Sequence, residues 1–227
     1  NETGSIDSRV KANPTYGQSI VSWTGTGSAT TVGHGLSSAP EMVIAKNRDS
    51  TTHWTVYHSS LGNTKFIDLN QTNASDTSTS VWNDTTPTNA VFSVGTNSRV
   101  NGNTNDLIAY CFHSVTGYSK FGSYTGNGST TGPTVTLGFR PAFLMIKSST
   151  QAENWNIIDA TRSPTNVGNK AVLKANVTSA EGANWACDFN DNGFQIKTAG
   201  GEENANGQTY IYMAFADKRE YAYWLDQ

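Results

Sequence analysis

Four histidines are the side chains best suited to act as general bases: His34, His53, His58 and His113. Nucleophile–base catalysis also needs a serine or cysteine held in a strained turn, and no Gly-x-Ser-x-Gly string occurs. The sequence repeats itself, as described below, and no histidine stands opposite another. When the two repeats are aligned at a spacing of 101 residues, His34 is aligned with Val135 and His58 with Asp159. We therefore expect solvent-facing histidines and no enzyme activity.

Oxygen-bearing side chains are concentrated in the segment Asp188–Gly193. An EF-hand calcium loop would need a bidentate glutamate at its twelfth position, where Ala199 stands. The Asp-Asn-Gly end of the segment favours a hairpin turn between two short strands. We predict the turn and leave a structural calcium ion as the alternative. No pair of carboxylates stands out as a glycosidase acid and base, so the sequence assigns no catalytic, metal or cofactor site.

Aromatic residues are the remaining candidates for ligand contact. Trp82 lies in a polar stretch and is followed by Asn83 and Asp84. An exposed tryptophan can stack on a sugar face while neighbouring amide and carboxylate groups bind hydroxyls. These three residues are the candidate ligand-facing loop, and the alternative is a strand residue turned inward. Trp54 and Trp155 recur at equivalent positions, which indicates core packing in strands.

The sequence contains an internal repeat, with a spacing of about a hundred residues between equivalent positions. Trp23–Ser28 returns as Tyr124–Ser129, and Pro40 returns as Pro141, both at a spacing of 101. Phe92–Val94 matches 194–196 at a spacing of 102. The pairs Gly25/Gly27 and Gly126/Gly128 could suggest phosphate loops, but no lysine or helix follows, so turn geometry explains them. A duplicated unit of this size indicates two domains.

Composition favours β-structure. Charged residues make up 15% of the 227 residues, below the usual quarter, and Ser, Thr, Asn and Gly replace them. Each unit shows short strand-like runs separated by turns at intervals of about ten residues, and no long helical spacing. The expected fold is all-β, with two tandem homologous β-sandwich (jelly-roll-like) domains. The expected boundaries are an N-terminal arm or linker (1–16), a first repeat (17–116), a second repeat (117–217) and a tail leading to a further domain (218–227).

Charge and hydropathy narrow the classes of partner. The formal net charge is −3 and there is no basic stripe, so nucleic acid is not expected. No apolar run approaches the length of a membrane span, so no membrane insertion is expected. Cys111 and Cys187 fall in different units, and we predict two small buried apolar side chains rather than a disulfide.

Four segments carry a resemblance to a known family: Gly117–Gly128, Val32–Leu36 followed by Pro40, Gly138–Lys147 and Thr209–Ala216. They resemble an uncharacterised domain in structural proteins of marine tailed phages, cyanophages in particular. The resemblance implies a virion structural protein, a tail fibre module for assembly and host attachment or receptor binding. It implies a place on the phage tail or another exposed particle surface. Implied partners are other tail proteins, a host glycan or receptor, and two further copies in a homotrimer.

Two other function classes stay open. One is a carbohydrate-binding, lectin-like module that uses the loop at Trp82. The other is a polysaccharide-degrading tailspike enzyme.

Overall fold

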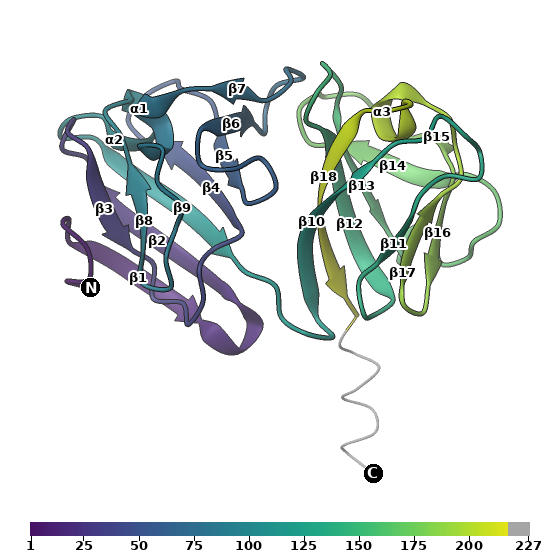
Figure 1. The fold of residues 1–227 in the computed structure, drawn as a ribbon, viewed down its shortest axis with the longest axis horizontal. Helices are drawn as coiled ribbons and strands as arrows, with labels where there is room; N and C mark the ends of the chain where they lie inside the picture. The colour runs from purple at the N-terminus through teal and green to yellow at the C-terminus, as the bar shows by residue number, and fades with distance from the viewer. Residues whose placement is uncertain (218–227) are drawn as a thin grey trace, which may run out of the picture. The chain divides into compact units, whose positions relative to one another are not determined.

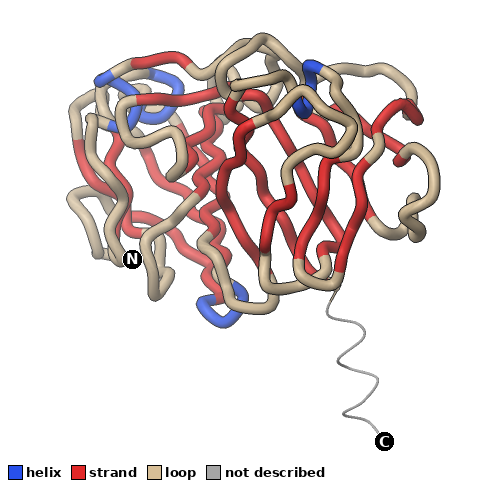
Figure 2. The backbone as a smooth tube through the Cα atoms, turned by 45° about the vertical axis from the view of Figure 1, so that its right-hand side comes forward, coloured by secondary structure: helices blue, strands red, loops and turns tan. Residues whose placement is uncertain are grey.

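The computed structural model describes residues 1–217 and divides the chain into two units, Asn1–Ser114 and the part from Val115 onward. Strands dominate each unit, and the helical segments are single turns (Figures 1 and 2). The predicted all-β, sandwich-type fold is confirmed. No helix within residues 1–217 is both long and apolar enough to cross a membrane. The predicted tail 218–227 lies outside the described residues.

The first unit contains nine strands. In chain order its elements are β1 (Ser8–Asn13), a 3₁₀ turn (Pro14–Tyr16), β2 (Gln18–Thr24), β3 (Thr30–Gly33), β4 (Met42–Asn47), β5 (Thr55–His58), β6 (Lys65–Asp68), β7 (Asp76–Thr77), α1 (Thr79–Trp82), β8 (Val91–Val94), α2 (Ser98–Asn101) and β9 (Asp106–Phe112). One sheet has the order β1-β2-β9-β4-β5-β6-β7, and β3 and β8 form a second, two-stranded sheet. Side chains of both sheets, such as Val21, Val43, Val32 and Phe92, meet in one buried core.

Within residues 115–217, the second unit also contains nine strands, because it lacks a counterpart of β1 and has one extra hairpin strand in its smaller sheet. Its elements are β10 (Ser119–Thr125), β11 (Thr134–Thr136), β12 (Pro141–Ser148), β13 (Trp155–Asp159), β14 (Lys170–Lys174), β15 (Gly182–Trp185), β16 (Cys187–Asn190), β17 (Gly193–Ile196), α3 (Gly201–Asn204) and β18 (Thr209–Ala216). Its sheets have the orders β10-β18-β12-β13-β14-β15 and β11-β17-β16. A core that includes Leu144, Ile158 and Phe194 lies between them.

Residues 1–16 belong to the first unit, whereas the sequence suggested an arm or linker. β1 pairs antiparallel with β2, with Arg9 opposite Ser22 and Lys11 opposite Ile20. Upstream of β1, the N–H groups of Ser5 and Ile6 donate to the Thr31 carbonyl of β3 at 3.0 and 3.1 Å. The N-terminal segment therefore joins both sheets of the first unit along one side (Figure 1).

A buried asparagine explains why the glycine loop recurs. Asn101, at the end of α2, has no exposed surface, and its amide nitrogen donates to the carbonyls of Ser28 (2.6 Å) and Gly95 (2.8 Å). Its amide oxygen accepts from the N–H of Thr26 at 2.9 Å. A Cβ on Gly25 would stand 2.2 Å from the Gly102 carbonyl oxygen, so this position needs glycine.

Asn204 holds the second loop in the same way. Its amide nitrogen donates to the carbonyls of Ser129 (2.8 Å) and Thr198 (2.7 Å), and its oxygen accepts from the N–H of Asn127 at 2.8 Å. A Cβ on Gly126 would stand 2.3 Å from the Ala205 carbonyl oxygen. The repeated glycines and asparagines therefore serve the fold.

One ion pair recurs with its charges exchanged. Arg99 of the first unit donates to both carboxylate oxygens of Asp68 at 2.8 Å. Lys174 of the second unit contacts Glu202 at 2.7 Å. The positions correspond, because Asp68 pairs with Thr55 across the sheet and Lys174 with Asn156, 101 residues further on. Each unit thus joins β6 or β14 to its last single-turn helix by a pair of opposite sign.

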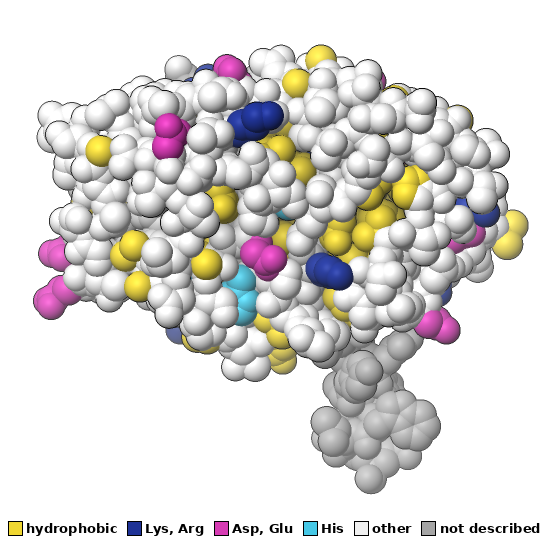
Figure 3. Space-filling view, viewed as in Figure 1, with side chains coloured by type: hydrophobic (Ala, Val, Ile, Leu, Met, Phe, Trp, Pro, Cys, Tyr) yellow, Lys and Arg dark blue, Asp and Glu magenta, His cyan; other side chains and the backbone are white. Residues whose placement is uncertain are grey.

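The surface is polar but sparsely charged. On the face drawn in Figure 3 most atoms are neither apolar side chains nor charged groups. This agrees with the low charged fraction of 15%. Ligand contacts on such a surface depend on hydroxyl and amide groups and on the few local groups of charges.

Candidate functional site

The expectation that the histidines face solvent is wrong for three of the four. His34, His58 and His113 are buried, and His53 is half-buried. The ring atoms bond to backbone or amide groups: Nδ1 of His58 accepts from the N–H of Ser60 (3.2 Å), and Nδ1 of His113 lies 2.9 Å from the Ser114 carbonyl. These nearby backbone groups make burial of the rings favourable, because a buried polar group needs a partner.

His34 shows the physical reason most clearly. Its Nδ1 accepts from the N–H of Leu36 (3.1 Å), so Nε2 carries the proton and donates to the Thr88 carbonyl (3.1 Å). Burial lowers the pKa of His34, the Thr88 carbonyl opposes this shift, and electrostatic repulsion from His113 acts with burial. The ring is a neutral part of the core. Val32 pairs with Phe92 in the first unit, and Val135 pairs with Phe194 in the second, so these positions are equivalent. His34, two residues after Val32, therefore corresponds to Leu137 of the second unit.

The two cysteines are buried free thiols, as predicted. Burial raises the pKa of Cys111 to about 12. Burial also raises the pKa of the Cys187 thiol. Because the thiolate is the nucleophile, neither cysteine is suited to nucleophilic chemistry at neutral pH.

Of the three residues proposed to face a ligand, one is buried in the structure and two are exposed. Trp82 ends α1 and is 2% exposed, packed edge-on against Tyr57 with ring centroids 5.9 Å apart. It therefore cannot stack on a ligand, and the inward alternative is correct, although in a single helical turn rather than a strand. Asn83 and Asp84 are exposed with positive φ angles of 54° and 45°. A ligand at these two residues stays a prediction.

The recurring tryptophans differ between the units. Trp155 is buried in β13, as expected of a core residue. Trp54 lies just before β5 and is only half-buried, stacked on Tyr110 with ring centroids 6.3 Å apart. Both backbone N–H groups donate to an asparagine side chain, of Asn70 (3.0 Å) and Asn176 (2.8 Å). The shared feature of the two tryptophan positions is therefore this hydrogen bond, which fixes the backbone at the start of the strand.

The oxygen-rich segment of the second unit is a hairpin, as predicted. β16 and β17 pair with Asn190 opposite Gly193, which leaves Asp191 and Asn192 as a two-residue turn. Asp191 is fully exposed and lies 4.0 Å from Arg140. Within residues 1–217, no group of three or more histidine, cysteine or acidic side chains is placed to hold a metal ion.

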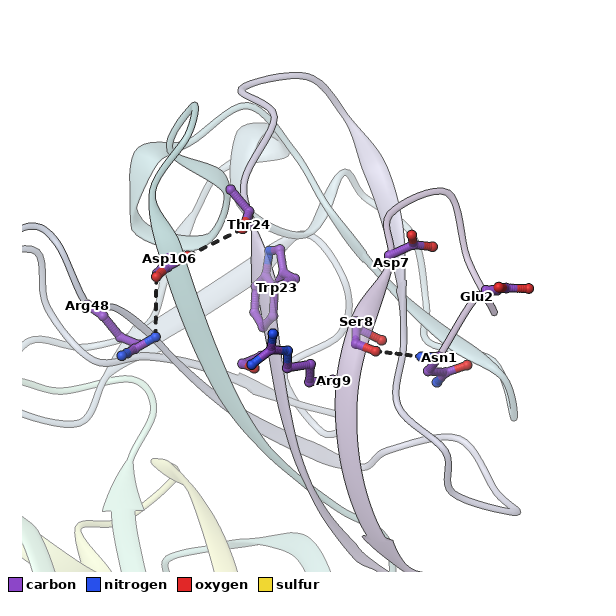
Figure 4. A pocket seen from close by; sticks show the side chains of 10 residues that line it. Asn1, Glu2, Asp7, Ser8, Arg9, Trp23, Thr24, Arg48 and Asp106 are labelled. Carbon is purple, nitrogen blue, oxygen red and sulfur yellow. Dashed lines mark hydrogen bonds and ion pairs between the residues drawn. The ribbon is translucent and has the colours of Figure 1, made fainter.

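The site that the structure brings forward is a cleft in the first unit, with a volume of about 510 Å³ (Figure 4). It lies where the N-terminal segment and β1 pass the ends of β2 and β9. The lining residues are Asn1, Glu2, Asp7, Ser8, Arg9, Ser22, Trp23, Thr24, Arg48 and Asp106. Figure 4 shows Arg48, Asp106 and Thr24 on one side, and Glu2 and Asp7 on the other, with Arg9 between them.

One side of the cleft is held by a short chain of polar contacts. Arg48 lies 3.6 Å from Asp106, and both side chains are more than half exposed. The Thr24 hydroxyl donates to Asp106 at 3.3 Å. The backbone of the Arg48 loop is fixed as well, because its N–H donates to the Asp106 carbonyl at 2.9 Å and Asp49 accepts from the Asp106 N–H at 2.6 Å.

The other side depends on the N-terminal segment. Within this segment, the Ser8 N–H donates to the Asn1 carbonyl at 3.0 Å. The Ser8 hydroxyl donates to the Gly33 carbonyl of β3 at 2.9 Å. Arg9 is exposed and forms no ion pair among residues 1–217. Its guanidinium donors remain open for a ligand.

The chemistry of the cleft is polar and of mixed sign. Three carboxylates, two guanidinium groups and the hydroxyls of Ser22 and Thr24 line it. Trp23 is only 4% exposed and packs edge-on against Phe92 in the core, so neither its ring nor its enclosed indole N–H can reach a ligand. Carboxylate acceptors beside guanidinium donors suit a neutral molecule with adjacent hydroxyl groups, because each hydroxyl both donates and accepts.

No local sequence pattern indicates this cleft, because its residues come from separate segments. Arg9, Arg48 and Asp106 lie on β1, on the loop after β4 and on β9. One signal was present, the alternation of polar and apolar residues over Ser8–Asn13, which is typical of an edge strand. A strand predicted here and paired with the next strand would have placed Arg9 beside Ser22.

A family model with the description "Domain of unknown function (DUF7483)" matches residues 1–219. Comparison with curated proteins and with solved structures finds no match.

Proposed function

The chain belongs to the family described as Domain of unknown function (DUF7483), and because that description states no activity, we propose a function from the geometry and the resemblance given above. The protein is a non-enzymatic structural module of a virion, part of a tail fibre. It contributes to host attachment through the cleft of its first unit, which binds a hydroxyl-rich, neutral saccharide of the host surface.

The observation that carries this proposal is that the polar cleft belongs to one copy of a duplicated framework. The recurring residues, such as Gly25 and Asn101 with their counterparts, are engaged in holding loops. The cleft depends instead on the N-terminal segment and β1, which precede the repeat. A feature absent from the shared framework is the best candidate for a specific role.

The composition of the cleft supports the ligand class. An anionic sugar would meet the carboxylates of Glu2, Asp7 and Asp106, and a cationic one would meet Arg9 and Arg48. Hydroxyl pairs satisfy both kinds of group without burying an unpaired charge. Rigid strands with polar loops at their ends are also a usual support for attachment sites.

The test is binding of the full chain to neutral and charged oligosaccharides, by glycan array and then by saturation-transfer NMR. We expect neutral oligosaccharides to bind, and Arg9→Ala and Asp106→Ala each to weaken binding about tenfold, since each removes charge-assisted hydrogen bonds. Asp191→Ala, at a fully exposed carboxylate of the second unit, is the matched control and leaves binding unchanged.

Three results would overturn the proposal. Wild-type chain that retains no neutral saccharide excludes the ligand class. Loss of binding in Asp84→Ala, with Arg9→Ala and Asp106→Ala unaffected, moves the site to the loop after Trp82. New reducing ends in a polysaccharide incubated with the chain identify an enzyme instead.

A further inference from the structure

Four polar side chains of the second unit form a connected group beside α3. Lys174 of β14 and Asn154, which immediately precedes β13, both donate to Oε1 of Glu202, each at 2.7 Å. Asn176 donates from Nδ2 to Oδ1 of Asn154 at 2.9 Å. An amine, a carboxylate and an amide are thus joined in one chain of hydrogen bonds, outside the cleft of the first unit.

These contacts fix the orientation of the Asn154 amide. A carboxylate only accepts hydrogen bonds, so the amide nitrogen of Asn154 must face Glu202 and its oxygen must face Asn176. Asn176 is fixed in turn, because its Oδ1 accepts from the Trp155 N–H at 2.8 Å. The amide carbon of Asn154 therefore has a hydrogen-bond donor at its oxygen and a carboxyl group at its nitrogen.

The Lys174 amine lies close to that carbon. It shares one oxygen atom of Glu202 with the Asn154 nitrogen, so the two nitrogens are neighbours. The Lys174 and Glu202 side chains are only 26% and 23% exposed, so water competes in part for their contact. The amine and the amide belong to neighbouring strands, because Lys174 pairs with Asn156 across the sheet.

Glu202 is placed to move a proton between the two nitrogens, because both contact the same oxygen. A neighbouring carboxyl group supports this role. Burial raises the pKa of Glu153, the negative charge of Glu202 adds to that shift, and Lys147 and Lys174 oppose it. Two negative charges repel each other, so a proton held on Glu202 relieves the repulsion.

We propose that the second unit forms an isopeptide bond between Lys174 and Asn154, with Glu202 as the proton carrier. Glu202 takes a proton from the ammonium group, and the neutral amine of Lys174 attacks Cγ of Asn154. The Nζ–Cγ bond forms, and Asn176 stabilises the charge that develops on Oδ1. Glu202 then gives its proton to Nδ2, the Cγ–Nδ2 bond breaks and ammonia leaves. The carboxylate takes the extra proton from Nζ and passes it to the ammonia, which departs as ammonium.

The bond strengthens a short strand pairing. β13 and β14 pair at only two positions within the described residues, Asn156 with Lys174 and Ile157 with Leu173. A covalent link at this point closes the long connection between the two strands. The ion pair of Lys174 and Glu202 is the arrangement that precedes the bond. The reaction happens once in each chain, so it does not make the module an enzyme.

The first unit has the same framework with other side chains. The residues in the places of the amide, the amine and the carboxylate are His53, Asp68 and Arg99. Asn70 keeps its place, because its Nδ2 lies 3.1 Å from His53 Nδ1 and its Oδ1 accepts from the Trp54 N–H at 3.0 Å. This unit has no attacking amine and no amide carbon at these three positions, so we expect no link in it.

The test measures the intact mass of the full chain during incubation at neutral pH, followed by trypsin digestion and mass mapping. We expect the folded chain to lose the mass of one ammonia molecule. Because trypsin does not cleave after an acylated lysine, peptide 171–197 should remain uncut at Lys174 and be joined to peptide 148–162. Urea unfolding should show a higher midpoint for the second unit of linked chains, since the bond constrains the unfolded chain.

Two conservative variants separate a missing bond from an unfolded unit. Lys174→Arg keeps a cation beside Glu202 but has no attacking amine, and it should keep the full sequence mass. Glu202→Gln keeps the size of the side chain and should slow the mass loss at least about a hundredfold, since it cannot carry the proton. Lys65→Ala, at an exposed lysine of the first unit, is the matched control and should form the link as the wild type does.

The link is refuted by a wild-type chain that keeps its full mass while well-dispersed amide signals show that it is folded. It is also refuted by an ammonia loss that persists in Lys174→Arg, because cyclisation of an asparagine would then explain the loss. A link that maps to Asn156, opposite Lys174 across the sheet, overturns the assignment of Asn154 as the acceptor.

Discussion

Removal of the Asn101 side chain should destabilise the first unit selectively. Asn101→Ala deletes three hydrogen bonds, to Thr26 N–H, Ser28 C=O and Gly95 C=O, and all three backbone groups lie in loops that this side chain joins. Each such bond contributes about 1 kcal/mol net, and a buried partner left unpaired costs more. We therefore expect a loss of about 3 kcal/mol, a large share of the roughly 5–15 kcal/mol of a domain.

The assay is urea unfolding followed by hydrogen exchange, which reads the units separately through amides of β9 and β18. The midpoint of the first unit should fall while that of the second stays unchanged. The matched control is Asn103→Ala, two residues further on, where the asparagine is exposed. Asn204→Ala should produce the mirror result in the second unit. A loss below about 1 kcal/mol, or one equal to that of Asn103→Ala, would refute the reasoning.

Three further predictions follow from described contacts. Gly126→Ala should lower the melting temperature of the second unit strongly, because the new Cβ would lie 2.3 Å from a carbonyl oxygen; an unchanged value in calorimetry contradicts this. Asp68→Lys and Arg99→Glu should each destabilise the first unit, and the double variant should recover about 1 kcal/mol or more in a double-mutant cycle, as the exchanged pair of the second unit indicates; additive losses would exclude the coupling. The pKa of His34 is lowered by burial, so its contribution to stability is present above the unfolded value of 6.5 and is lost as the pH falls below it. His34→Leu should flatten that acid dependence in urea titrations, and an identical slope in both proteins would show that another group titrates.

The architecture could be predicted because it depends on local signals that recur. The hairpin Asp188–Gly193 and the loop glycines follow from turn chemistry, which acts over a few residues. The burial of His34 could not be predicted in the same way, because its partner, the Thr88 carbonyl, lies 54 residues further along the chain. A fixed spacing of 101 also misaligned it by two positions, since small length changes separate the copies.

The candidate site was missed for a related reason. A polar cleft arises from where strands end in space, and neither Arg48 nor Asp106 carries a local pattern that indicates it. Trp82 was misplaced because a helix of one turn is too short for its periodicity to be seen. Sequence pattern thus predicts the strands, whereas the contacts between distant loops require coordinates.

The exchanged ion pair has a consequence for the folding of the whole chain. Neighbouring domains of similar sequence are prone to assemble with each other's elements while they fold. A hybrid that combined β6 of the first unit with α3 of the second would bring Asp68 beside Glu202, and the reciprocal hybrid would bring Lys174 beside Arg99. Both combinations place like charges beside each other, whereas each authentic unit pairs opposite ones. The reversal of sign therefore disfavours pairing between elements of the two units while the chain folds, because such a pairing would place like charges together.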